Sequence, residues 1–248
     1  TAQDRCAVVN SAGSEIWVSE DQLLPAERAR AQKGEPPSAE FIEILKARVL
    51  KYRDQDIMGY MVGHEPECRG ISPEHLKHCY QIVKELDPYH PMICATRSPE
   101  RYIDTADVFR VHPYLDPMIN SKGERQMKSP MMIKNVCQET IRAGHGRKAL
   151  WVTLGTFAYN FLNIYSVPPT FEETNCMFWL SVVNGARGFF TYIYYQSFET
   201  QELKEGTDFI YYSLDRLKDY IMTTETNLPI EITGGGVDAA IKTHSGKI

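Results

Sequence analysis

Apolar and amphipathic stretches alternate along the chain from residue 38 onward. The amphipathic stretches carry apolar residues at helical spacing, and the short apolar runs between them are typical of strands buried on both faces. The pattern predicts strands at residues 57–63, 92–96, 107–112, 149–154 and 188–195. It predicts helices at residues 40–52, 73–86, 99–105, 130–143, 171–183 and 209–223. This succession of βα units predicts an α/β fold with a parallel sheet covered by helices.

Two of these helices have specific start signals. Ser72 is a good N-cap residue, and Pro73 after it suits the first helical position, where no backbone N–H is needed. Thr170 and Glu173 have the spacing of a capping box, in which each side chain satisfies a backbone N–H of the other residue. Both helix starts are therefore predicted from local chemistry as well as from periodicity.

A doubly wound open sheet and a closed barrel both fit this alternation. No glycine-rich phosphate loop follows any predicted strand, whereas polar and aromatic residues follow several of them, which favours a barrel with its site on the C-terminal face. We therefore expect a (β/α)8 TIM-type barrel, of which this chain supplies the C-terminal five or six βα units. The alternative is a fold that is not a closed barrel, in which this sequence contains all strands of the sheet.

The expected organisation has three parts. Residues 1–37 form an N-terminal segment, the end of an earlier barrel unit, with at most one strand around residues 7–9. Residues 38–228 form the barrel units. Residues 229–248, with alternating apolar positions after Pro229, begin a β-rich C-terminal domain. Since the chain begins at Thr1 without an initiator methionine, we expect a processed or truncated protein.

Composition narrows the function classes. The 248 residues carry a net charge of −5, which gives no reason to expect nucleic acid or an anionic membrane as a partner. No stretch approaches the roughly 20 apolar residues that span a bilayer, so no membrane insertion is expected. The six cysteines form no Cys-x-x-Cys pair and the seven histidines form no His-Glu-x-x-His motif, so neither a metal nor another cofactor is expected. The cysteines are expected to be buried thiols, with disulfides in a secreted protein as the alternative.

Glu65 is the strongest candidate for a catalytic residue. It follows the strand predicted at residues 57–63, and the C-terminal end of a barrel strand faces a concave, partly desolvated mouth. Such an environment favours the protonated carboxyl group that a general acid needs. A glutamate in a surface loop is the alternative, because Glu-Pro is common in loops.

Several segments in order resemble retaining glycoside hydrolases with (β/α)8 barrels. Residues 63–67 (Gly-His-Glu-Pro-Glu) are similar to their Asn-Glu-Pro motif, and residues 86–91 to their Leu-Asp-Pro-x-x-Pro segment. Residues 107–114 are similar to their Ala-Asp-Val and Asn-x-Tyr strand. Residues 169–173 and 184–188 are similar to the final helix and strand of poorly characterised bacterial relatives. The resemblance covers roughly residues 40–200 and implies that Glu65 is the acid/base.

The resemblance breaks at two functional positions. His64 stands where those enzymes have an asparagine that holds the sugar's 2-hydroxyl, and Leu154 stands where they have the nucleophilic glutamate. A retaining hydrolase needs two carboxyl groups about 5–5.5 Å apart, and an inverting one about 6.5–9.5 Å. Standard retaining catalysis is therefore not expected.

Other residues near strand ends are candidates for the same mouth. We predict substrate contacts from His64, Arg97, His112, Tyr114 and Glu199. Each has a structural alternative: a loop cap for His64, an ion pair for Arg97, a hydrogen bond within the barrel for His112, a core-rim position for Tyr114, and a solvated loop for Glu199. Asp116 and Glu202 could also supply a carboxylate, although Asp116 before Pro117 is more typical of a turn. Glu173 is better explained by its capping box.

Two functions follow from these residues. The first is a glycosidase with an altered catalytic pair, in which Glu65 is the general acid. The second is an inactive, glycosidase-like barrel that binds a glycan or serves in assembly with other protein chains. Both take a glycan or polysaccharide as partner, and the resemblance implies an extracellular or secretory location. Whether a second carboxylate accompanies Glu65 separates the two.

Overall fold

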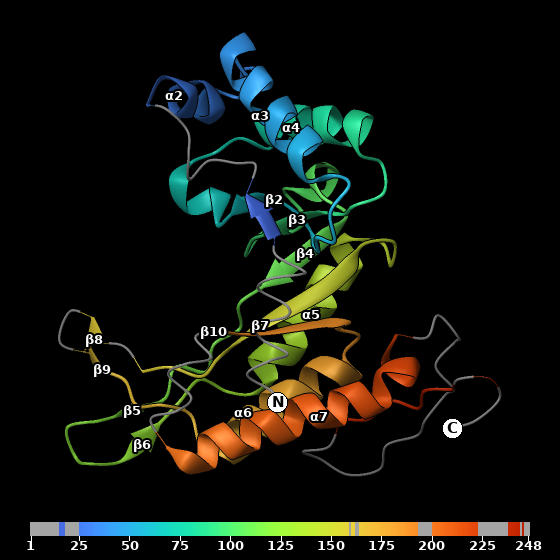
Figure 1. The fold of residues 1–248 in the computed structure, drawn as a ribbon. Helices are drawn as coiled ribbons and strands as arrows, with labels where there is room; N and C mark the ends of the chain where they lie inside the picture. The colour runs from blue at the N-terminus through green and yellow to red at the C-terminus, as the bar shows by residue number, and fades with distance from the viewer. Residues whose placement is uncertain are drawn as a thin grey trace. The chain divides into compact units, whose positions relative to one another are not determined.

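The protein is a mixed α/β structure whose main sheet strands are parallel (Figure 1). The computed structural model describes residues 15–17, 25–158, 160–161, 164–192, 200–222, 238–243 and 245. The chain divides into two compact units. The first comprises residues 1–111 and 140–149, and the second comprises residues 112–139 and 150–248.

In the first unit, four parallel strands lie side by side in the order of the chain. They are β1 (Glu15–Trp17), β2 (Gly59–His64), β3 (Met92–Ala95) and β4 (Val108–Val111). The helices that connect them are α2 (Pro25–Lys33), α3 (Ala39–Tyr52) and α4 (Pro73–Leu86), with the short 3-10 turns η2 (Pro66–Arg69) and η3 (Ile103–Thr105). Parallel strands need such crossover connections, because their ends lie far apart.

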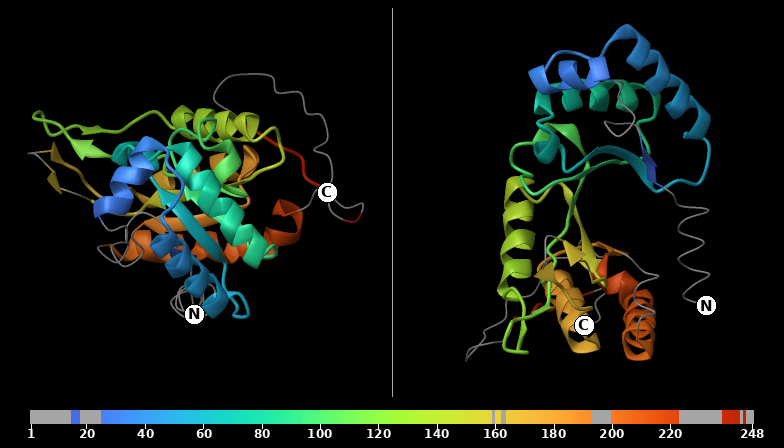
Figure 2. Two further views of the ribbon diagram at one scale, coloured as in Figure 1. Left: turned by 90° about the horizontal axis from the view of Figure 1, so that it is seen from above. Right: turned by 90° about the vertical axis from the view of Figure 1, so that its left-hand side faces the viewer.

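The core of the first unit lies between α3, α4 and one face of the strands (Figures 1 and 2). The strands contribute Tyr60, Val62, Cys94 and Phe109 to this core, and the helices contribute residues that recur at helical spacing: Phe41, Leu45, Val49, Leu76, Cys79 and Val83. Because successive strand residues point to opposite faces, Met61, Ile93, Ala95 and Arg110 lie on the face turned away from these helices.

A register shift in β2 changes which side chains face the helices. Met61 pairs with Ile93, but Gly63 pairs with Cys94, so one extra residue of β2 lies between the two pairs. A Cβ on Gly63 would lie 3.2 Å from a methyl carbon of Leu76 on α4, which explains a glycine on this crowded face. The shift turns His64, which pairs with Ala95, to the face opposite the helices.

The second unit is built around the parallel strands β7 (Ala149–Gly155) and β10 (Gly188–Tyr192). Helices α6 (Phe171–Val183) and α7 (Gln201–Ile221) pack together beside them, and α5 (Met131–Ala143) precedes β7 in the chain. Phe178 of α6 contacts the rings of Phe189 on β10 and Tyr211 on α7, with centroids 5.7 and 5.6 Å apart. These contacts define the helix-facing side of β10.

Two short antiparallel hairpins complete the second unit. They are β5 (Met118–Ile119) with β6 (Arg125–Gln126), and β8 (Asn160–Phe161) with β9 (Ile164–Tyr165). Arg125 forms a two-pronged ion pair with Glu173, with N–O distances of 2.8 and 2.5 Å. Burial opposes ionisation of Glu173, but the bonds from Arg125 and from the Thr170 backbone hold its pKa below the ordinary value. The start of α6 therefore anchors the β5–β6 hairpin.

Most predicted elements are confirmed within one or two residues, including the N-cap at Ser72 and the capping box at Thr170. The predicted start of the last helix at residue 209 was wrong: α7 begins at Gln201, capped by Thr200. Of the helix predicted at residues 99–105, only η3 is helical. Helix α2 and strand β1 were not predicted. Closure into a TIM-type barrel remains a prediction.

Parts of several predictions lie outside the described residues. These are the strand around residues 7–9, the end of the last strand at residues 193–195, and residues 229–237 of the C-terminal segment. The division of the chain at residues 37 and 228 also remains a prediction. The expectation of buried thiols is confirmed in part: burial raises the pKa of the Cys79 and Cys137 thiols to about 12, whereas Cys68 and Cys176 are exposed.

Candidate functional site

Glu65 begins the turn that follows β2. Its backbone N–H donates to the carbonyl of Ala95 at 2.6 Å, which extends the pairing of β2 with β3 by one residue. Its backbone has φ 48° and ψ 52°, in the left-handed region. A residue with a Cβ adopts this conformation at a cost of about 1–2 kcal/mol, and such strain is found preferentially at functional sites. The strain fixes where the Glu65 side chain leaves the strand.

Arg97 and Glu65 form an ion pair within the first unit. Nη2 of Arg97 donates to Oε1 of Glu65 at 2.9 Å, and the side chains are 71% and 26% exposed respectively. The pairing raises the pKa of the Arg97 guanidinium above its ordinary value. Two residues that were predicted separately are thus brought together. In this arrangement the carboxylate oxygen of Glu65 is a hydrogen-bond acceptor from a cation.

Glu67 holds the backbone that carries Arg97, and sequence reasoning assigned it no role. Its Oε1 accepts from the backbone N–H of Arg97 at 2.6 Å, and its Oε2 accepts from Oγ1 of Thr96 at 3.0 Å. The carboxylate therefore ties the turn after β2 to the turn after β3. The sequence places Glu67 in a Glu-Pro-Glu segment directly after a predicted strand. Its contacts with Thr96 and Arg97, however, depend on the register of the strands.

His64, Ala95 and Arg110 form one row across β2, β3 and β4, on the face turned away from the helices. Arg110 is 8% exposed, which is rare for an arginine, and its position within an apolar strand gave no hint of a site. The row places two basic side chains at the C-terminal ends of these strands. The contact between His64 and a sugar remains a prediction.

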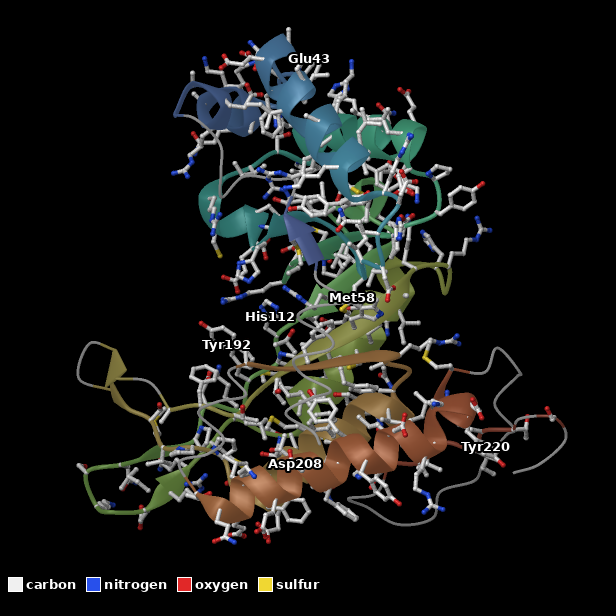
Figure 3. All side chains as sticks on the ribbon, in the orientation of Figure 1. Glu43, Met58, His112, Tyr192, Asp208 and Tyr220 are labelled. Atoms are coloured by element: carbon white, nitrogen blue, oxygen red, sulfur yellow. The ribbon has the colours of Figure 1, made fainter. Side chains whose placement is uncertain are left out.

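The second unit holds an aromatic cluster made of His112, Tyr114, Phe157 and Tyr192, of which His112 and Tyr192 are labelled in Figure 3. The rings of His112 and Tyr114 are stacked, with centroids 5.9 Å apart, and Tyr114 is also stacked on Tyr192 at 6.4 Å. Phe157 meets Tyr114 and Tyr192 edge-on, at 5.3 Å each. Tyr192 remains 50% exposed, so the cluster presents an aromatic face to solvent.

The register of β7 and β10 explains how the cluster forms. Gly155 pairs with Tyr192, and a Cβ on Gly155 would lie 3.2 Å from ring carbons of both Tyr114 and Phe157. The glycine therefore leaves the space that these two rings occupy. Phe157 and Tyr192 were not among the predicted site residues. They lie near Tyr114 because of the way the strands pair. The sequence shows that aromatic residues follow predicted strands, but it does not show which of these residues meet.

Leu154 faces the helices of the second unit. It pairs with Thr191, whose hydroxyl lies 3.3 Å from the hydroxyl of Tyr211 on α7, and residues paired across parallel strands share a face. Trp151 lies on the opposite face, where its ring centroid is 5.5 Å from that of Phe190. Leu154 is fully buried. The position that the resemblance assigns to a nucleophile thus holds an apolar side chain turned toward α7.

The remaining candidates lie outside these two groups. Asp116 has a left-handed backbone, with φ 47°, and pairs with Lys128, consistent with its expected place in a turn. Glu202 is exposed in the first turn of α7. Glu199 lies outside the described residues. Substrate contacts from Arg97, His112, Tyr114 and Glu199 remain predictions.

In the described part of the chain, no group of three or more histidine, cysteine, aspartate or glutamate side chains could hold a metal ion. No helix in the same residues is both long and apolar enough to cross a membrane.

Comparisons with protein families and with curated proteins gave no match. Among solved structures, the chain is similar to a family 39 glycoside hydrolase from the gut symbiont Bacteroides cellulosilyticus WH2, with 16% sequence identity and a TM-score of 0.39. The similarity covers 62% of this chain and 38% of that chain, so it spans less than half of that protein. A similarity at this level carries no residue role to this chain.

Proposed function

We propose that this chain binds a carbohydrate through the aromatic cluster. The observation that supports this proposal is the stack of Tyr114 on Tyr192, with half of Tyr192 exposed at the end of β10. A sugar ring presents C–H groups that pack against an aromatic face, and hydroxyl groups that bond to polar atoms at its rim. Tyrosine and histidine supply both kinds of contact. The edge-on contacts of Phe157 hold the two tyrosine rings in place.

Two features favour binding over retaining hydrolysis. Leu154 is apolar and turned toward the helices, so it supplies no carboxylate. Oε1 of Glu65, the candidate acid, is engaged by the guanidinium of Arg97 at 2.9 Å. Retaining hydrolysis requires a carboxylate and a carboxylic acid at a fixed separation. A non-catalytic glycan-binding role needs neither and fits an extracellular or secretory location.

The binding proposal is tested by affinity electrophoresis and calorimetry with soluble β-glucan, xylan, mannan and pectin. Tyr192→Ala should weaken binding about tenfold, the equivalent of about 1.4 kcal/mol, because one stacking face is lost. Tyr192→Phe should keep most of the affinity, because the ring remains. Tyr89→Ala is the matched control, since Tyr89 is 91% exposed in the first unit. Binding that is unchanged in Tyr192→Ala, or absent from the whole panel, would refute the proposal.

A second candidate function is hydrolysis with Glu65 as general acid. Its support is the strained, left-handed backbone of Glu65 at the end of β2. The test is hydrolysis of aryl glycosides and polysaccharides from about pH 4 to about pH 8, beside Glu65→Gln. A loss of hydrolytic activity by several orders of magnitude in Glu65→Gln would establish Glu65 as a catalytic residue. If neither protein is active on any substrate, the binding function alone remains.

A further inference from the structure

The outer side of α7 carries an exposed aromatic stripe that the aromatic cluster does not use. Phe209 is 58% exposed and Tyr212 is 48% exposed, whereas Leu203, Ile210, Leu214 and Ile221 of the same helix are buried. The buried side is formed by Leu203, Gly206, Thr207, Ile210, Leu214 and Ile221. Figure 1 shows α7 along one side of the second unit, and Asp208 and Tyr220 mark this part of the helix in Figure 3. Because residues three apart on a helix are neighbours, the two exposed rings lie side by side rather than scattered singly over the surface.

Charged residues flank the two rings on the same side of the helix. Glu205, Phe209, Tyr212 and Arg216 are spaced by four, three and four residues, so they form one line, called here the α7 stripe. Glu205 and Arg216 are both exposed. Gln201 donates to Glu205 at 2.7 Å, and Nη1 of Arg216 donates to the Tyr212 hydroxyl at 3.2 Å, which orders both charged side chains along the helix. The stripe therefore runs from an acid through two rings to a base.

We propose that the α7 stripe docks on the α7 stripe of a second copy of this chain, with the two helices antiparallel around a two-fold axis. In that arrangement Glu205 meets Arg216 of the partner subunit, and Phe209 meets Tyr212 of the partner subunit. The axis relates the two halves of the stripe, so each contact occurs twice. Charge complementarity within the stripe favours this occupant, because the acid–ring–ring–base order becomes its own complement only when the second helix is reversed.

The expected dimer is weak. A helix of 21 residues is about 31 Å long, and one such pair covers less than the roughly 800 Å² per partner of a standard interface. A dissociation constant on the order of 10 μM or weaker is therefore expected. Antiparallel helix dipoles and the two ion pairs add orientation more than affinity, and the association should weaken at high salt.

The test is sedimentation velocity of the whole chain from about 1 μM to about 300 μM. Phe209→Glu should shift the protein to monomer, and Glu205→Arg or Arg216→Glu alone should weaken the dimer at least tenfold. The double variant Glu205→Arg with Arg216→Glu should restore it, because the exchanged charges meet again across the axis. Tyr89→Glu, in the first unit, is the control and should dimerise as the unchanged protein does. Circular dichroism confirms that each variant is folded.

Three results would overturn the proposal. The unchanged protein could remain monomeric over the whole concentration range, which would mean that the α7 stripe does not bind a second copy of this chain. A dimer could form that Phe209→Glu does not weaken, which would place the interface elsewhere. The double charge exchange could fail to restore a dimer that the single exchanges weaken, which would contradict the antiparallel pairing. Restoration by the double exchange supports the assignment independently of any glycan binding.

Discussion

The guanidinium of Arg97 lies 2.9 Å from the carboxylate of Glu65 and comes from the turn after the neighbouring strand. The pair joins Glu65, whose backbone is left-handed, to the residue that Glu67 holds by its backbone. Glu65 is mostly shielded by its surroundings, whereas Arg97 is largely exposed. The pair is therefore a contact between a fixed carboxylate and a side chain that solvent reaches.

Removing Arg97 should cost little stability, but more than removing an exposed partner elsewhere. Arg97→Ala should lower the free energy of unfolding by up to about 1 kcal/mol, because it leaves a partly shielded carboxylate without its cation. Lys77→Ala is the matched control, since Lys77 pairs with Asp104 at 2.8 Å and both side chains are exposed. Urea unfolding of the two variants measures the difference. An effect of Lys77→Ala equal to or larger than that of Arg97→Ala would contradict this account.

The backbone strain at Glu65 can be separated from its charge. Glu65→Gly and Glu65→Ala both remove the carboxylate, but only glycine adopts φ 48° without a steric cost. We expect Glu65→Gly to be more stable than Glu65→Ala by about 1 kcal/mol, after allowing for the greater freedom of glycine in the unfolded chain. Thermal and urea unfolding of the two proteins checks the order. Equal stabilities would mean that this backbone conformation is not maintained in solution.

Placing a carboxylate at Leu154 should disrupt the fold rather than create a nucleophile. Leu154 is fully buried on the helix-facing side of β7. Leu154→Glu would bury an unpaired charge and should lower the free energy of unfolding by about 3 kcal/mol or more. Leu154→Met, which conserves volume, should lower it by less than about 1.5 kcal/mol. A folded Leu154→Glu protein of unchanged stability would show that this side chain reaches solvent.

Asp238 ties the C-terminal segment to two helices of the second unit and makes stability depend on pH. Its carboxylate accepts from Nζ of Lys134 at 3.1 Å and from Nδ2 of Asn184 at 2.6 Å. Burial opposes ionisation, but these bonds hold the pKa of Asp238 below its ordinary value of 3.8. The contribution to stability is therefore present above about pH 4 and is lost as the pH falls through the lowered pKa.

Asp238→Asn should lower the free energy of unfolding by about 1–2 kcal/mol at pH 7, because the ion pair with Lys134 is lost. The gap between the variant and the unchanged protein should begin to close below about pH 4 and should disappear as the pH falls through the lowered pKa of Asp238, where the aspartate of the folded protein becomes protonated. Asp104→Asn, at an exposed ion pair, is the control and should show a smaller gap at pH 7. A gap for Asp238→Asn that does not change with pH would exclude the ion pair as its cause.

The sequence predicted correctly those helix starts that depend only on residues close together in the chain. Ser72 with Pro73, and Thr170 with Glu173, fix their helix starts through contacts within one turn. Gly206 concealed the start of α7, since glycine is unfavourable inside helices. Tertiary packing requires the glycine at this position, because a Cβ there would lie 2.1 Å from the ring of Phe171 on α6. That contact is invisible along the chain.

The site divides in the same way. Glu65, Arg97 and Tyr114 were identifiable because they follow predicted strands. That Arg97 meets Glu65, or that Tyr114 stacks on Tyr192, depends on the pairing of strands and the space left by Gly155. The turn of Leu154 toward the helices also depends on register, because a shift of one residue reverses every side chain of a strand. Residue types near a site were therefore predictable, and their partners were not.

The orientation of Leu154 bears on which substitutions could place an acid at the end of β7. A codon change at this position alone would put an acid into the packed layer beside α7, and selection for stability would remove it. To place a carboxylate on the opposite face, a lineage would need an insertion, a deletion or an acid at a neighbouring position. Selection for a stable fold therefore closes the one-residue route to an acid on that face, whatever function the chain has.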